Sequence, residues 1–260
     1  MTQRTRTLYA MMALLLFAIG CGSAKKEATA AAPEAPSTTA AAPAGATGSA
    51  SISGTVSFEG TPPAAAKIAM DADPICQTEH AAHGMTTEDV VVTNGKLKNV
   101  FVYVKDGLGG ATFPAPTTPA KLDQHGCWYD PHIVGVQAGQ PLEIVNSDGT
   151  LHNVNAKPTV NQPFNVAQPV KGMKTTKTFT KPELAIKVKC NVHPWMHAYI
   201  NVVEHPFFGV TDEAGNFSLQ GLPAGTYTLE AWHEKFGAAT QTVTVAAGET
   251  QHVSFTFKAQ

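Results

Sequence analysis

The 260-residue sequence lacks the motifs of several large functional classes. It has no Cys-x-x-Cys-His run to attach a haem and no His-Glu-x-x-His pattern to hold a catalytic zinc ion. Glycine-rich phosphate-binding loops and a Ser-His-Asp arrangement are also missing. The 18 basic residues form no run or stripe that would neutralise nucleic-acid phosphates. We therefore expect neither an enzyme nor a nucleic-acid-binding protein.

Long amphipathic helices are also missing from the pattern. Only a short helix near residues 75–82 is indicated, whereas short alternating segments separated by turn residues predict strands throughout. Asn94-Gly95 predicts a hairpin turn. The clearest strand segments are 52–58, 90–93, 100–104, 133–136, 142–145, 176–179, 185–189 and 198–203. Their spacing predicts an all-β sandwich or barrel.

The one apolar run near the N-terminus is short for a membrane span. Residues 9–19 follow Arg4 and Arg6, which is typical of an export signal covering residues 1–20. The signal ends in Phe-Ala-Ile-Gly-Cys21, which resembles a bacterial lipoprotein box with Ala18 at the usual leucine position. The resemblance implies that Cys21 is acylated and that the protein is a periplasm-facing lipoprotein of the outer membrane. Simple secretion and an uncleaved anchor are the alternatives.

Large apolar side chains are nearly missing between residues 21 and 50. This Ala-, Pro- and Thr-rich segment buries too little surface to offset its ordering entropy, so we expect a disordered tether. About 30 coil-like residues would span roughly 30 Å. Cleavage after residue 20 would leave 16 basic and 20 acidic residues, a formal net charge of −4. Such a charge fits a soluble body that docks through a local patch.

The most informative stretch is Cys190-Asn-Val-His193-Pro-Trp-Met196, in which three metal-binding side chains lie within seven residues. Upstream, an apolar strand leads to His152. Two imidazoles, one thiolate and a distant thioether form the ligand set of a blue copper electron-transfer site. Pro194 restricts the turn that would bring His193 and Met196 to one metal.

Residues 124–203 resemble a cupredoxin, and the Cys-x2-His-Pro-x-Met loop is similar to that of amicyanin. The resemblance implies a Greek-key β-sandwich with one type 1 copper, held in plane by His152, Cys190 and His193 and axially by Met196. Asn153 would hydrogen-bond the ligand loop and the cysteine sulfur. The resemblance further implies single-electron transfer with a partner such as a cytochrome or oxidoreductase.

The loop residues around His193 would form the contact with that partner. His193 is expected to be the exposed edge through which electrons pass, with Pro194, Trp195 and Ala198 as an apolar rim. Trp195 would exclude water from the metal, with simple loop packing as the alternative.

Other readings of the same residues remain open. His197, with His152, Cys190 and His193, would form a tetrahedral zinc site, and a sandwich that binds no metal is a further alternative. His80, His83 and Met85 suggest a second, loose copper site that would suit copper storage, delivery or sensing. His132 is expected to be a packed or edge residue.

The two remaining cysteines, Cys76 and Cys127, form a candidate disulfide. Export would place them in an oxidising compartment, where cysteines pair. Two buried free thiols are the alternative.

The C-terminal turn pattern is distinctive. Gly215-Asn-Phe-Ser-Leu219 and Leu222-Pro-Ala-Gly-Thr-Tyr227 resemble the carboxypeptidase regulatory-like (transthyretin-like) β-sandwich over residues 204–258. The division we expect is a copper domain at 51–203 followed by this small sandwich at 204–260. In the alternative, residues 51–70 complete the C-terminal sandwich, because that family's usual first strand is missing just upstream of residue 204. A structural or ligand-binding lipoprotein without a redox role also remains an option.

Overall fold

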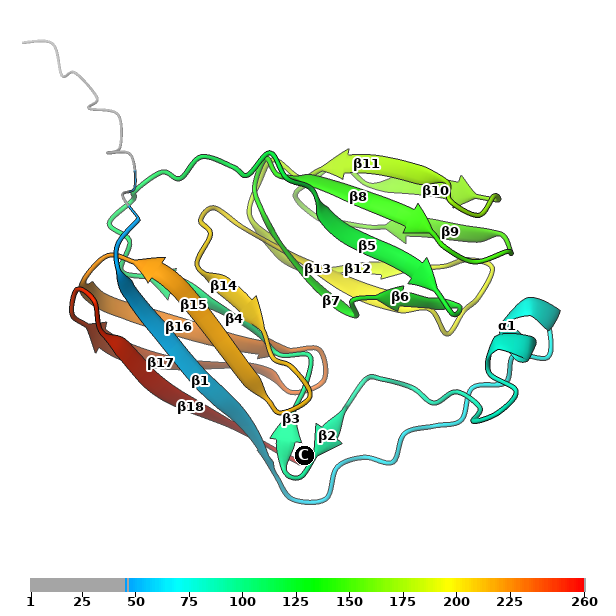
Figure 1. Ribbon diagram of the computed structural model, residues 1–260, viewed down its shortest axis with the longest axis horizontal. Helices are drawn as coiled ribbons and strands as arrows, with labels where there is room; N and C mark the ends of the chain where they lie inside the picture. Colours follow the sequence, from blue (N-terminus) through cyan, green and yellow to red (C-terminus); the bar gives the residue numbers. More distant parts are fainter. Residues whose placement is uncertain (1–44, 46, 260) are drawn as a thin grey trace, which may run out of the picture. The chain divides into compact units, whose positions relative to one another are not determined.

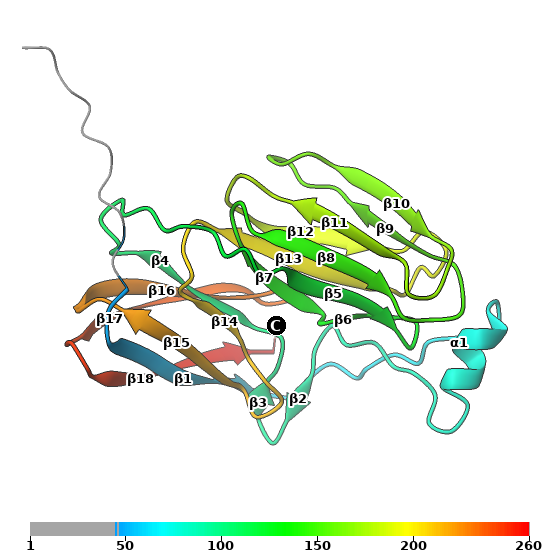
Figure 2. The ribbon, with the colours of Figure 1, turned by 45° about the horizontal axis from the view of Figure 1, so that its top comes forward.

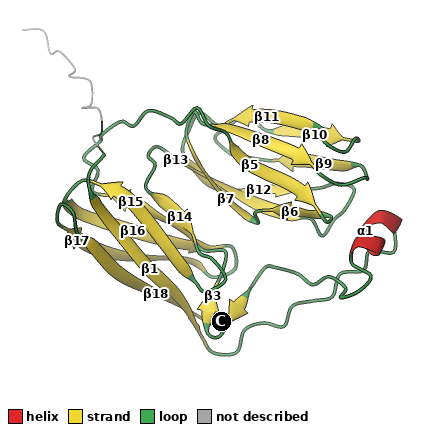
Figure 3. Ribbon diagram, in the orientation of Figure 1, coloured by secondary structure: helices red, strands yellow, loops and turns green. Residues whose placement is uncertain are grey.

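The computed structural model describes residue 45 and residues 47–259. The expected signal segment 1–20, the Cys21 lipidation site and most of the 21–50 tether lie outside these residues. The described part is all-β, as predicted, with 18 strands and one short helix, α1 (Pro74–Glu79) (Figure 3). None of the described helical residues forms a segment long and apolar enough to cross a membrane.

Nine strands form a first sandwich, here called the central sandwich. One sheet has the order β10-β9-β12-β13-β7 and the other β11-β8-β5-β6 (Figure 2). The strands are β5 (Ala120–His125), β6 (Trp128–Asp130), β7 (Ile133–Gln137), β8 (Pro141–Asn146), β9 (His152–Ala156), β10 (Phe164–Gln168), β11 (Lys174–Thr178), β12 (Glu183–Lys189) and β13 (His197–Val203).

Alternating side chains from both sheets fill the central sandwich. Leu122, Ile144, Val154, Ile186 and Ile200 are each at most 2% exposed and belong to one apolar cluster. Burying an aliphatic side chain of this size contributes about 1.5–3 kcal/mol. The cluster also contains Cys190 and Met196, so the candidate ligand loop is anchored in the core.

The other strands form the terminal sandwich. Its sheets are β15-β1-β3-β2, with β18 also paired to β1, and β14-β4-β16-β17. The strands are β1 (Ala50–Glu59), β2 (Val92–Thr93), β3 (Lys96–Leu97), β4 (Phe101–Asp106), β14 (Phe208–Val210), β15 (Asn216–Leu222), β16 (Gly225–His233), β17 (Gly237–Val245) and β18 (Thr250–Lys258).

Strand β1 lies between two C-terminal strands (Figure 1). It runs antiparallel to β15, with Ile52 opposite Leu219, and parallel to β18, with Val56 opposite Phe255. β1 and β18 approach each other closely at Gly54, where a Cβ would lie 2.2 Å from the Val253 carbonyl oxygen.

Residues 50–59, which fall almost entirely within the segment expected in the copper domain, therefore pair with strands of the C-terminal sandwich. β4 joins that sandwich as well, paired with β14 and β16. The physical reason is the alternation of Ile52, Val56 and Phe58 into the same core as the C-terminal strands. The central sandwich is thus inserted between β4 and β14.

Candidate metal centre

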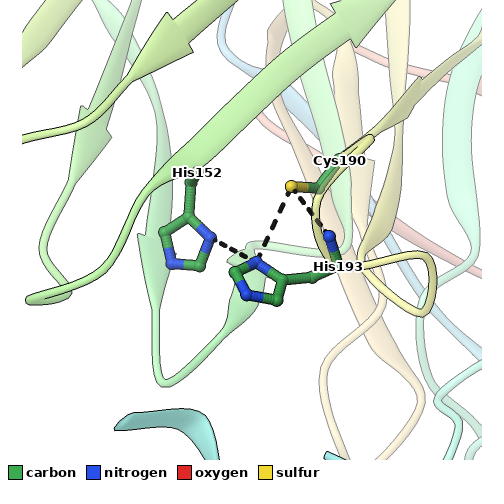
Figure 4. A group of neighbouring side chains, drawn as sticks. All are labelled: His152, Cys190 and His193. Atoms are coloured by element: carbon green, nitrogen blue, oxygen red, sulfur yellow. Dashed lines mark hydrogen bonds between the residues drawn. The ribbon is translucent and has the colours of Figure 1, made fainter. Parts of the chain in front are cut away.

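Three metal-binding side chains converge at one end of the central sandwich (Figure 4). The Nδ1 atoms of His152 and His193 are 3.0 Å apart, and the Cys190 Sγ lies 3.8 Å from the His193 Nδ1. One donor atom from each residue lies within 4.8 Å of the others. All three residues are at most 2% exposed. Three of the four sequence-predicted ligands, His152 from one segment and Cys190 and His193 from another, therefore meet in a buried cluster.

Two rigid elements hold the cluster. His152 is the first residue of β9, whereas Cys190 and His193 lie in the loop between β12 and β13. This loop folds back on itself, because the Cys190 amide donates to the Met196 carbonyl at 3.1 Å and the Met196 amide donates to the His193 carbonyl at 3.0 Å. Met196 is fully buried. The loop thus holds the thioether in the same core cluster as the thiolate.

Asn153 supports the loop from β9. Its side-chain oxygen accepts a hydrogen bond from the Asn191 amide at 2.5 Å, and its backbone bonds to the Cys190 sulfur. The His193 amide also donates to the Cys190 Sγ, at 3.4 Å. Such partners around a ligand fix its orientation and tune a bound metal.

Each histidine of the cluster is oriented by a carboxylate. His152 Nε2 lies 2.8 Å from the Asp148 Oδ2, and His193 Nε2 lies 3.0 Å from the Asp73 Oδ2. In the neutral imidazoles that metal binding requires, donation of each Nε2–H to a carboxylate leaves both Nδ1 lone pairs facing the sulfur. This is the arrangement in which histidine binds metals, since its other nitrogen is usually tied to a carboxylate or carbonyl.

The thiol of the cluster is readily ionised. Burial alone would raise the pKa of Cys190, but hydrogen bonds from His152 and His193 lower it to about 5. Burial would lower the pKa of His152, yet the Asp148 carboxylate raises it to about 9. A metal ion would therefore meet a preformed thiolate and displace the proton of its imidazole partner.

A short covering segment lies over His193. Asp73 caps α1 by accepting from the Ile75 and Cys76 amides, and a disulfide joins Cys76 in α1 to Cys127. The Cys76 Sγ lies 3.7 Å from the His193 Nε2. The expectation that His193 is an exposed edge was wrong: it is 2% exposed, because Asp73 and the disulfide-linked helix cover it.

The sequence did not reveal Asp73 as part of the site. It lies 120 positions before His193, and its only local signal is the Asp-Pro start of a short helix. Trp195 does lie against the site, with its ring centroid 5.1 Å from that of His193. Its indole also donates to the Cys127 carbonyl at 3.1 Å, which ties the loop to the disulfide.

Other sequence candidates do not join the cluster. His197 Nε2 points to Asp89 Oδ1, at 3.0 Å, so the zinc arrangement with Cys190 and His193 does not form. His80 bonds the Gly126 carbonyl and Met85 is buried in the apolar core.

Fold and site together define an all-β protein with a cupredoxin-like sandwich, whose His/Cys/Met cluster resembles a type 1 copper site. A second module is shown at the C-terminus, where the family model of the carboxypeptidase regulatory-like domain matches residues 194–258. The match begins within the β12–β13 loop and includes β13 of the central sandwich.

Solved copper proteins are similar to about a third of the chain. A Cu-containing nitrite reductase from Thermus scotoductus SA-01 is 25% identical over 34% of this chain and 23% of its own, with a TM-score of 0.30. A Cu(I) amicyanin mutant is 21% identical over 32% of this chain and 81% of its own chain, with a TM-score of 0.29. The purple cupredoxin from Nitrosopumilus maritimus is 19% identical over 32% of this chain and 98% of its own chain, with a TM-score of 0.28. No curated protein matches the chain.

Proposed function

We propose that the protein is a type 1 copper electron carrier of the bacterial cell envelope. The observation that carries the proposal is the convergence of the two Nδ1 atoms with the Cys190 Sγ, while both Nε2 atoms are held by carboxylates. Copper would supply one-electron redox chemistry. His152, Cys190, His193 and Met196 would hold it.

The residues around the ligands fit an electron carrier better than an enzyme. Ligands anchored on β9 and in a loop tied by backbone hydrogen bonds move little, so the reorganisation between Cu(II) and Cu(I) stays small. A thiolate and a thioether favour Cu(I) and raise the potential. Copper held by these four buried side chains would have no open position for a substrate.

Since α1 covers His193, electrons would take another route to the surface. We propose that they pass through the β12–β13 loop, where Trp195 packs on His193 and Val192 is 45% exposed. A redox partner, such as a cytochrome or oxidoreductase, would dock there. Acylation of Cys21 would tether the protein to the periplasmic face of the outer membrane.

Copper storage, delivery or sensing is the second candidate. That role requires exchangeable copper, whereas the ligands here are buried beneath a disulfide-linked helix. Of the expected extra soft ligands, His80 is already bonded to the Gly126 carbonyl and Met85 is buried in the apolar core. Electron transfer is therefore the better-supported function.

Voltammetry of the copper-loaded protein separates the two functions. We expect a reversible one-electron wave that survives in Met196→Gln with a lowered potential, because a harder axial ligand favours Cu(II). Met173→Gln, at an exposed methionine, is the matched control and should leave the potential unchanged. Fast copper transfer to a chelator together with sluggish electron exchange would contradict the proposal and favour copper handling.

A further inference from the structure

A second group of metal-binding side chains lies outside the copper-type cluster. It consists of His132, His197 and Glu234, whose donor atoms all lie within 4.8 Å of one another. Asp89 adjoins them, with its Oδ1 3.0 Å from the His197 Nε2. We call these four residues the His/carboxylate cluster.

Four separate chain segments supply this cluster. His132 directly precedes β7 and His197 begins β13, whereas Glu234 lies in the turn between β16 and β17 and Asp89 in the loop before β2. The side chains of His132 and Glu234 are 2% and 3% exposed, and those of His197 and Asp89 are 16% and 28% exposed. The cluster is thus mostly buried, with one side toward solvent.

Glu234 is the centre of the cluster. Its Oε1 contacts the His132 Nε2 and its Oε2 lies 3.6 Å from the His197 Nε2. Burial alone would raise the pKa of Glu234, but His132 and His197 hold it well below its usual range. The carboxylate is therefore ionised and available to a cation.

The spacing of the donors suits a small divalent metal ion. A zinc ion with bonds of about 2.0–2.1 Å to nitrogen and oxygen in a tetrahedron separates its ligand atoms by roughly 3.3 Å. The distances of 3.0 Å from His197 to Asp89 and 3.6 Å from His197 to Glu234 lie on either side of that value. Two imidazoles and two carboxylates, with no sulfur, form a ligand set that zinc accepts.

We propose that His132, His197, Glu234 and Asp89 bind a divalent metal ion of the zinc class, at a site separate from the thiolate cluster. Lys235 faces the site from one side, with its Nζ 3.1 Å from the Asp89 Oδ2. With both imidazoles neutral, the two carboxylates and this ammonium leave one negative charge, which a divalent ion overcompensates. The ion replaces the protons that the imidazoles otherwise share with the carboxylates.

An entry path is present beside Asp89. A cavity of about 290 Å³ is lined by Asp89 and Lys235, together with Thr87, Val90 and Phe236. An ion would reach the buried Glu234 through the partly exposed Asp89 side chain. The inference does not depend on the proposed electron-carrier function, because no residue is shared between the two clusters.

The test measures zinc binding in the full-length protein. Equilibrium dialysis with Zn²⁺ against a competing chelator, followed by elemental analysis, gives the stoichiometry for wild type, Cys190→Ser and Glu234→Gln. We expect Cys190→Ser to retain zinc at the His/carboxylate cluster. Glu234→Gln should weaken binding there by more than the ~10–100-fold that loss of an outer-shell partner costs.

Cobalt(II) reports the ligand type at the same site. In the Cys190→Ser background, Co²⁺ should give ligand-field bands of a nitrogen- and oxygen-ligated ion, and these should disappear on addition of Asp89→Asn. Asp89 is the most exposed of the four residues, so this variant should fold even if Glu234→Gln does not. His252→Gln, at an exposed histidine bonded to Ser53, is the matched control.

Two outcomes would overturn the proposal. Equal zinc affinity in Cys190→Ser with and without Asp89→Asn would show that the cluster is an ion-pair network only. Loss of all zinc in Cys190→Ser alone would assign the bound metal to the thiolate cluster. If the Cu(II)-loaded protein showed no thiolate-to-copper band, the zinc-binding results would still be interpretable, because the His/carboxylate cluster contains none of the proposed copper ligands.

Discussion

Asp73 links the covering helix to a candidate metal ligand. One carboxylate oxygen caps α1, and the other accepts from His193 and from the Thr150 hydroxyl at 2.7 Å. These hydrogen bonds overcome burial and lower the pKa of Asp73 to about 2. A negative charge is thus fixed behind the imidazole at neutral pH, where it would stabilise Cu(II) relative to Cu(I).

Replacing Asp73 by asparagine tests that charge. Asp73→Asn keeps an oxygen acceptor while removing the charge, so the potential should rise by on the order of 60 mV, equal to a tenfold change in preference between oxidation states of a one-electron couple. Voltammetry of the copper-loaded variant measures the shift. Asp71→Asn, at an exposed neighbour, is the control, and equal potentials in both variants would rule out the assigned role.

His233 is a second residue with a measurable charge effect. Its ring stacks on Phe236, lies 6.3 Å from the tilted Phe257 ring, and accepts a hydrogen bond from the Lys235 amide at 3.1 Å. Burial lowers its pKa to about 4. Because the folded-state pKa lies below the unfolded value of about 6.5, its contribution to stability is complete above pH 6.5 and decreases as the pH falls to about 4.

In His233→Asn this pH dependence of the unfolding free energy should be lost, while the asparagine side-chain oxygen still accepts the hydrogen bond from the Lys235 amide. Between pH 7 and pH 4, wild type should lose on the order of 2–3 kcal/mol of unfolding free energy more than the variant. Urea unfolding at several pH values gives the difference. His252→Asn should retain the wild-type dependence, and parallel curves for wild type and His233→Asn would refute the argument.

At the scale of elements, α1 and the β12–β13 loop close the candidate copper site from two sides. The loop is fixed by its own backbone hydrogen bonds, whereas the six-residue helix is too short to be stable alone. Its anchor is the disulfide to Cys127, next to the Trp195 hydrogen bond. The cover over His193 therefore depends on this crosslink.

The double variant Cys76→Ser/Cys127→Ser tests the cover. Removing a crosslink between cysteines 51 positions apart should cost about 2–5 kcal/mol of unfolding free energy. Copper should pass to a chelator faster than from wild type, because α1 no longer holds Asp73 against His193. Stopped-flow chelation measures the rate. An unchanged rate, with lowered stability, would mean that the cover does not shield the metal.

At the scale of the whole molecule, the sequence was most informative where the relevant residues are close together in the chain. Cys190, His193 and Met196 lie in one tight loop, and their spacing together with the cupredoxin resemblance predicted that Cys190 and His193 lie close together. The carboxylate on His193 was missed because Asp73 comes from a segment 120 residues away. The position of β1 between β15 and β18 was only an alternative, since strand alternation reveals a buried face but not its partner.

The neighbours of His197 also could not be predicted from the sequence. Its place in the Cys-x2-His-x3-His spacing suggested a ligand beside Cys190, but β13 turns its ring toward Asp89 and Glu234. Successive residues of a strand face opposite sides, so Ala198 enters the core while His197 faces the other way. The sequence could not reveal that residues from the terminal sandwich would meet it there.

The central claim is that the Cys190 thiolate and two imidazoles bind one copper ion. The most direct measurement is the visible absorption and EPR spectrum of the full-length protein with one equivalent of Cu(II). The account predicts an intense thiolate-to-copper band that is lost in Cys190→Ser and retained in Cys76→Ser/Cys127→Ser. A colourless copper-loaded protein, or a band unchanged in Cys190→Ser, would contradict it.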